Sequence, residues 1–109
     1  MKAKEKIKEL QKKYESELMD LVVSRVCKHY KIDRKLITLK RQDAYISEPR
    51  QAAMYIMRIH RVGMRVIARY FSKDFTTVML AANTVQDRID TEDDFRQKIQ
   101  SLMDLCKAV

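Results

Sequence analysis

The sequence predicts an all-α protein, a compact bundle of about six helices, from three observations. Its 109 residues contain one glycine and one proline, whereas all-β folds need such turn residues between every few strands. Apolar residues recur three and four positions apart along most of the chain, which is the period of an amphipathic helix. Hydrophobic residues make up 46% of the chain, which at this length suits one folded domain with a modest core.

The first predicted element is a long amphipathic helix that ends near Tyr30. In residues 1–16 its apolar stripe is thin and lies among six lysines and three glutamates. We therefore expect residues 1–16 to be a charged helical extension and residues 17–109 to form the folded domain. The extension could be solvated, frayed or the contact of a weak homodimer. The stripe of the whole helix consists of Ile7, Leu10, Tyr14, Leu18, Leu21, Val22, Val26 and Tyr30.

A short helix, a loop and a central helix are predicted next. Asp33 is suited to cap a short helix around Leu36. Residues 38–47 (TLKRQDAYIS) lack a helical stripe and predict a basic loop. Ser47 followed by Pro49 marks the start of a helix, because proline is tolerated in the first turn. The run AAMYIM that follows is apolar nearly all round, which predicts a buried helix at the centre of the bundle.

A second short helix is predicted after the only glycine. Its spacing points Ile67, Tyr70 and Phe71 inward, and it leaves Arg65 and Arg69 on the outside.

Two more helices complete the predicted bundle. The first runs from Asp74 to about Ile89. Thr91 with Asp94 three residues later has the pattern of a capping box, which predicts the start of the last helix. The apolar positions of that helix are Phe95, Ile99, Leu102, Met103 and Cys106.

The positive charge is concentrated in one segment of the chain. The net charge is +3 in residues 1–16, +2 in residues 17–49, +5 in residues 50–88 and −2 in residues 89–109. A surface that serves solubility alone would mix the two signs more evenly, although this reading stays open. The uneven distribution favours a polyanion as partner.

Several other functions have no support in the sequence. Cys27 and Cys106 lie far apart among apolar positions and predict buried free thiols in a reducing cytoplasm. His29 and His60 have no partners at metal-binding spacing, and no acid, thiol or histidine cluster predicts an enzyme. No apolar run approaches the ~18–20 residues of a membrane span, and no GxxxxGK[ST] loop predicts a nucleotide site. We expect no cofactor, metal or membrane partner.

The helix that begins near Asp74 has an unusual first turn. At 100° per residue, Thr76 and Leu80 fall opposite the predicted core stripe and Thr77 falls on its flank. Adjacent β-branched residues are mediocre helix formers, so their exposure at a helix start needs a reason. The core stripe itself consists of Val78, Ala81, Ala82, Val85 and Ile89.

A short helix, a tight turn and this helix follow the order of a helix-turn-helix. In such motifs the first residues of the second helix meet base edges in the major groove of DNA. A threonine there offers a hydroxyl to base edges or phosphate and a methyl group to thymine. A structural alternative is that Asp74, Thr76 and Thr77 only cap the helix, and that Phe75 folds back onto Tyr70 or Phe71.

Three runs of sequence carry a resemblance to a known family. They are HYKIDRKLITLKRQ, EPRQAAMYIMR and VIARYFSKDFTTVMLA. From about Glu17 to Cys106 the chain resembles the C-terminal DNA-binding domain of the bacterial replication initiator DnaA. The resemblance implies a fold similar to that domain and to the Trp repressor, with a basic loop at the minor groove and a recognition helix in the major groove.

The resemblance also implies roles for individual residues. Thr76 and Thr77 fall on base-contacting threonines, and Phe75 and Leu80 replace two histidines of the recognition helix. Gln42 aligns with an arginine that the family inserts into the minor groove, and Ser72 with Lys73 replaces a glycine pair with arginine. We thus expect base contacts from Phe75, Thr76, Thr77 and Leu80, and contacts to the backbone or minor groove from Lys40, Arg41, Gln42, Arg50, Gln51, Arg65, Arg69, Lys73 and Asp74.

The expected function is sequence-specific binding of double-stranded DNA, in control of replication initiation or of transcription, without an ATPase motor. The target sequence and the choice between these two roles are left open. A helical adaptor that binds an acidic protein is the alternative. An RNA-binding role is disfavoured, because a helix does not fit the narrow major groove of RNA.

Overall fold

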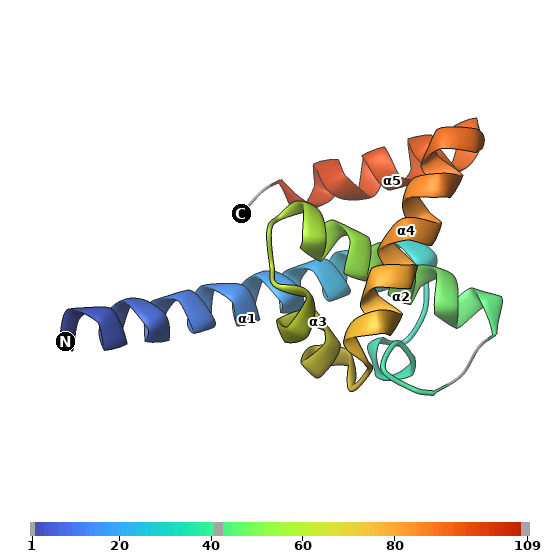
Figure 1. Ribbon diagram of the computed structural model, residues 1–109. Helices are drawn as coiled ribbons and strands as arrows, with labels where there is room; N and C mark the ends of the chain where they lie inside the picture. Colours follow the sequence, from blue (N-terminus) through green and yellow to red (C-terminus); the bar gives the residue numbers. More distant parts are fainter. Residues whose placement is uncertain (1, 41–42, 108–109) are drawn as a thin grey trace.

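The computed structural model describes residues 2–40 and 43–107, and the predicted all-α bundle is confirmed. Five α-helices and one 3-10 turn follow one another along the chain (Figure 1). Their bounds are α1 Lys2–Tyr30, η1 Arg34–Leu36, α2 Ala44–Ile59, α3 Met64–Phe71, α4 Phe75–Thr91 and α5 Asp93–Cys106. None of these helices is long and apolar enough to cross a membrane.

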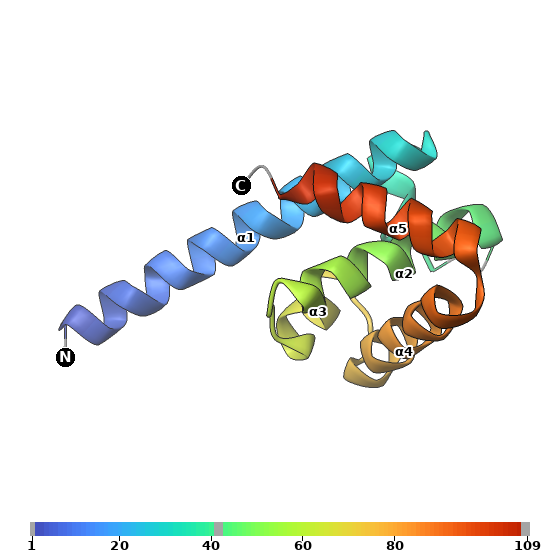
Figure 2. The same cartoon turned by 90° about the horizontal axis from the view of Figure 1, so that it is seen from above.

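The helix α2 is the centre of the bundle, as its sequence predicts. It packs against α1, α3 and α4, and all of its residues from Ala52 to Met57 are buried. Seen from above, α2 lies between α1 and α4 (Figure 2). The last helix, α5, closes the core by packing on α1 and α4. Cys27 and Cys106 are buried free thiols, as expected.

The first helix has a buried half and an exposed half. Leu18, Val22 and Val26 are almost inaccessible to solvent, whereas Ile7 remains 62% exposed. The exposed half projects from the bundle and gives the molecule its long axis of 48 Å (Figure 1). The backbone has no break between the two halves, so the expected boundary at residues 16 and 17 is a change in burial within one continuous helix.

Two predicted helix starts are wrong. The central helix begins at Ala44, so the predicted loop over residues 38–47 is helical in its last part and Pro49 lies beyond the first turn. Ile46 is fully buried, and its burial favours helix in a stretch whose polar neighbours show no stripe. The predicted capping box fails because Thr91 is the last residue of α4. Its hydroxyl donates to the Asp87 carbonyl at 2.8 Å.

Candidate nucleic-acid interface

The helices α3 and α4 pack together and are joined by a turn of three residues. Ser72 adopts the left-handed conformation with φ 54°, and the Lys73 N–H then donates to the Ala68 carbonyl at 2.8 Å. This closes the end of α3 and redirects the chain into α4. Ile67 and Phe71 are fully buried beneath the turn. The arrangement is the helix-turn-helix that the order of elements predicts.

The core stripe of α4 lies where its helical period predicts. Val78, Ala81 and Val85 are buried against the bundle. Thr76 and Thr77 are exposed on the first turn, and Leu80 is 56% exposed on the second. The side chain of Asp74, at the N-cap, makes no hydrogen bond to the helix. The first turn of α4 is therefore an outward-facing surface attached to a well-packed helix.

Phe75 does not fold back into the aromatic pair beside it. Tyr70 and Phe71 contact each other at a centroid distance of 5.1 Å. Phe75 is 40% exposed, and the guanidinium carbon of Arg65 lies 5.5 Å from the centre of its ring. The aromatic ring and the cation of α3 thus lie on the same outer surface as the threonines.

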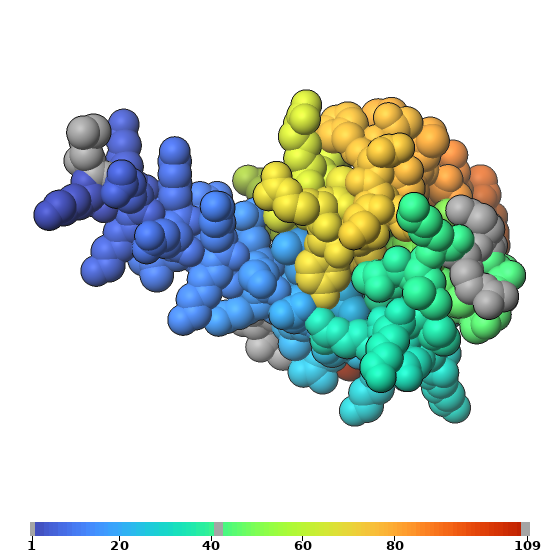
Figure 3. Space-filling view, turned by 90° about the horizontal axis from the view of Figure 1, so that it is seen from below, coloured from blue at the N-terminus to red at the C-terminus, as the bar shows by residue number. Residues whose placement is uncertain are grey.

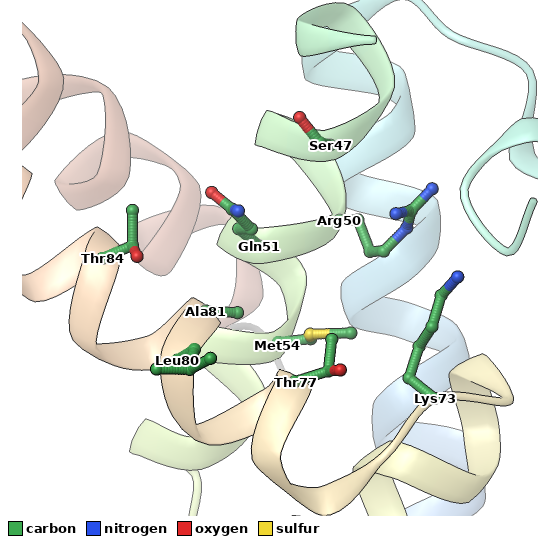
Figure 4. A pocket seen from close by; sticks show the side chains of 9 residues that line it. All are labelled: Ser47, Arg50, Gln51, Met54, Lys73, Thr77, Leu80, Ala81 and Thr84. Atoms are coloured by element: carbon green, nitrogen blue, oxygen red, sulfur yellow. The ribbon is translucent and has the colours of Figure 1, made fainter. Parts of the chain in front are cut away.

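A groove of about 230 Å³ lies between α2 and the start of α4 (Figure 4). It has an apolar floor at Met54 and Ala81, and polar side chains from both helices surround this floor. The sequence did not predict Ser47 or Thr84 as part of this surface. The period of α4 could have indicated Thr84, which lies one turn after Leu80. The residues that line the groove are Ser47, Arg50, Gln51, Met54, Lys73, Thr77, Leu80, Ala81 and Thr84.

Arg50 has a structural role that the sequence does not predict. Its side chain is only 5% exposed, its Nε donates to the Ile37 carbonyl at 2.8 Å, and its Nη2 donates to the Leu39 carbonyl at 2.5 Å. Burial lowers the pKa of this guanidinium. These carbonyls lie at the start of the basic loop, so Arg50 ties that loop to α2. The contact to phosphate that the resemblance implies stays a prediction.

Arg50 and Lys73 line the groove, and Lys40 lies near enough for its charge to act on Lys73. Partial burial lowers the pKa of the Lys73 ammonium, and the positive charges of Arg50 and Lys40 lower it further. The side chains of Arg50 and Lys73 extend toward the same side (Figure 4). Lys40 is exposed, whereas Arg41 and Gln42 lie outside the described residues. Mutual repulsion of this kind would be relieved by an anion bound between the cations.

An ion pair and a hydrogen bond hold the C-terminal half of α4 against α2. The Arg88 guanidinium forms an ion pair with Glu48 at 2.7 Å. Two residues earlier on α4, Gln86 accepts a hydrogen bond from the Tyr55 hydroxyl at 2.8 Å. These contacts lie away from the exposed first turn, so they orient α4 without occupying its outer surface.

The outer surface of the helix-turn-helix also includes exposed arginines of α3. Arg65 and Arg69 are exposed on α3. In the view from below, α3, the start of α4 and the residues around η1 share one face (Figure 3). Within the described ranges, 2–40 and 43–107, no group of three or more His, Cys, Asp or Glu residues could hold a metal ion.

Comparison with known proteins identifies the family. The family described as "Bacterial dnaA protein helix-turn-helix" matches residues 19–85. The chain is 28% identical to the chromosomal replication initiator protein DnaA of Bacteroides fragilis (strain YCH46), over 82% of this chain and 19% of that protein. It is 29% identical to the DnaA of Thermoanaerobacter sp. (strain X514), over 92% of this chain and 23% of that protein.

A solved structure agrees with the sequence comparison. The crystal structure of a DNA replication initiation factor superposes with a TM-score of 0.80 at 26% sequence identity, and covers 92% of this chain and 31% of that chain. The chain thus spans about a fifth of the length of the curated relatives it matches. The matched region is a DNA-binding and not a catalytic domain, in agreement with the expectation of no enzyme. The chain belongs to the bacterial DnaA helix-turn-helix family.

Proposed function

We propose that this protein binds double-stranded DNA in a sequence-specific way, with the start of α4 in the major groove and the basic loop at the minor groove. One observation carries the proposal. Thr76, Thr77 and Leu80 are exposed at the start of a helix-turn-helix recognition helix, beside a groove whose edge is lined with cations.

The first turn of α4 has the chemistry for direct readout. The threonine hydroxyls can donate to or accept from base edges, and their methyl groups can contact thymine. The unpaired N–H groups at the helix start are suited to a phosphate. Leu80 can discriminate only through shape and the thymine methyl group, because it has no polar atom. We therefore expect a site that contains thymines opposite Phe75 and Leu80.

The basic loop supplies the second contact. Lys40 lies at the end of its described part, and we propose that Arg41 and Gln42 reach the minor groove. Arg50 holds the start of this loop through the carbonyls of Ile37 and Leu39. Gln51, Lys73, Asp74, Arg65 and Arg69 are the proposed backbone positions around the two contacts.

The biological role that we propose is control of replication initiation or of transcription. The relatives are replication initiators by name, and the chain matches about a fifth of their length. Binding to an origin and binding to a promoter would use the same surface.

Selection from a random duplex library is the decisive experiment. We expect an enriched motif, and weaker binding to that motif by Thr77→Val, which removes a hydroxyl with little change in shape. Ser101→Ala, on the exposed side of α5, is the control that should bind as the unchanged protein does. Absence of any motif together with no detectable duplex binding at low salt would end the proposal.

The alternative is an adaptor that binds an acidic protein. Binding to such a partner would persist at ~0.5 M salt and would not be competed by duplex DNA, because phosphate binding falls steeply with salt. A weak homodimer through Ile7, Leu10 and Tyr14 also stays a prediction. These three side chains are 62%, 60% and 55% exposed.

A further inference from the structure

The exposed half of α1 presents its charges at a fixed position relative to the bundle. Residues 2–16 continue the helix whose later turns are anchored by Leu18, Val22 and Val26 in the core. At 1.5 Å per residue this half is about 20 Å long, which matches about six base pairs of duplex. Six lysines are thereby held beside the helix-turn-helix on residues 2–16, which form a straight rod.

A groove runs between this rod and the turn that joins α2 to α3. Lys8 and Lys12 line it from one side, and Arg61 lines it from the other. The groove also contains one carboxylate, Glu15, but the structure records no ion pair to any of the three cations within the described residues. The remaining lining residues are Gln11, Gly63 and Val66. The groove therefore carries a positive charge that the protein itself leaves largely uncompensated.

This groove and the helix-turn-helix lie on the same face. Figure 3 shows the exposed half of α1, α3 and the start of α4 together in the view from below. Arg61, Arg65 and Arg69 follow one another at steps of four residues from the groove along α3. The positive surface thus continues from the proposed DNA site toward the N-terminal rod.

The apolar stripe of the rod points elsewhere. At 100° per residue, the side chains of Lys8 and Lys12 centre about 150° away from the middle of the stripe formed by Ile7, Leu10 and Tyr14. A second copy that packed on the apolar stripe would leave the groove unoccupied. The groove itself offers cations from two elements, Lys8 and Lys12 from α1 and Arg61 from the turn before α3, which suits the phosphate backbone of nucleic acid.

We propose that the groove formed by Lys8, Lys12 and Arg61 binds the phosphate backbone of duplex DNA that flanks the recognition site on one side. The inference rests on the proposed function and enlarges the footprint beyond the helix-turn-helix. Because the rod projects in a single direction, the added contact is one-sided. It adds affinity without reading bases.

The test uses three duplexes that contain the selected motif. One carries the motif alone, and the other two extend it by about ten base pairs on one side or on the other. The full-length protein should bind only one of the two extended duplexes more tightly than the short duplex. For that duplex, the slope of log Kd against log salt concentration should be steeper than for the short duplex by about two to three, because each phosphate contact adds about 0.9.

Two triple variants locate the effect. Lys8→Gln with Lys12→Gln and Arg61→Gln should lose the one-sided gain and keep the affinity for the short duplex. Lys2→Gln with Lys6→Gln and Lys13→Gln removes the same charge from another face of the rod and should keep the gain. Equal gain on both flanks, no gain on either, or equal loss in the two variants would overturn the proposal.

Sedimentation of the same proteins shows whether a second copy of the chain, and not DNA, occupies the groove. If the groove variant dissociates a dimer, and the one-sided gain is absent, a protein chain occupies the groove instead and the proposal is wrong. Failure to bind even the short duplex would contradict the proposed function itself, which separates the two outcomes.

Discussion

The recognition helix and the basic loop border the same candidate DNA surface but are held in different ways. The helix α4 is held by apolar burial of Val78, Ala81 and Val85, whereas Thr76, Thr77 and Leu80 face outward. The start of the loop is held by a buried cation, Arg50, on two backbone carbonyls. Exposed residues of α4 can therefore change without loss of its apolar support. The loop instead depends on Arg50, a residue for which the family resemblance implies a contact to phosphate.

The largest expected effect breaks the apolar support of the helix-turn-helix. Phe71→Ala removes a fully buried ring beneath the turn and should lower the free energy of unfolding by about 3–5 kcal/mol. Phe75→Ala is the matched control, because that ring is 40% exposed and should cost much less. Urea unfolding of both variants measures the difference. Equal losses would show that Phe75 belongs to the core.

The second-largest effect is expected when the hydrogen bonds that hold the loop are removed. Arg50→Ala leaves two carbonyls without their charged donor and should lower the free energy of unfolding by about 1.5–3 kcal/mol. Affinity should fall on all DNA sequences, because the basic loop is no longer fixed. Urea unfolding and fluorescence anisotropy with duplex DNA measure the two quantities.

Arg65→Ala is the control for charge alone. Arg65 is exposed on α3, so its loss should change the free energy of unfolding by less than about 0.5 kcal/mol and flatten the salt slope by about one. If Arg50→Ala behaves in the same way as Arg65→Ala, then Arg50 is a phosphate contact and not a support of the loop.

A third prediction tests whether the outer face of α4 can be changed without loss of stability. Leu80→His gives the exposed position a polar ring and should alter base preference at one or two positions by about 1–3 kcal/mol. Its free energy of unfolding should stay within about 0.5 kcal/mol, since Leu80 is 56% exposed. Selected motifs of the two proteins are compared. Identical motifs would remove Leu80 from the reading surface.

The smallest expected effect concerns the exposed half of α1. Deletion of residues 2–16 removes side chains that make no contribution to the core, so the melting temperature should stay nearly the same. Calorimetry of the shortened and full proteins tests this. A collapse of the folded state would show that the rod stabilises the bundle, against its observed exposure.

Much of the fold followed from helical periodicity. The inward positions of α3 and α4 were predicted correctly, because a 3.6-residue period fixes which side chains share a face. The starts of α2 and α5 were not. Ile46 favours helix because it is fully buried in the fold, and Thr91 does not cap α5 because it is the last residue of α4. Local signals are weak where a tertiary contact of a few kilocalories per mole opposes them.

The sequence by itself determined the all-α class, the exposed threonines of α4 and the concentration of positive charge, since each depends on residue types and spacing along one helix or segment. Only the tertiary structure decided the role of Arg50. Its acceptors, Ile37 and Leu39, lie more than ten residues away along the chain, and nothing in the local pattern indicates that folding brings their carbonyls to its guanidinium. A buried cation needs partners that satisfy its donors, and such partners exist only once the chain has folded.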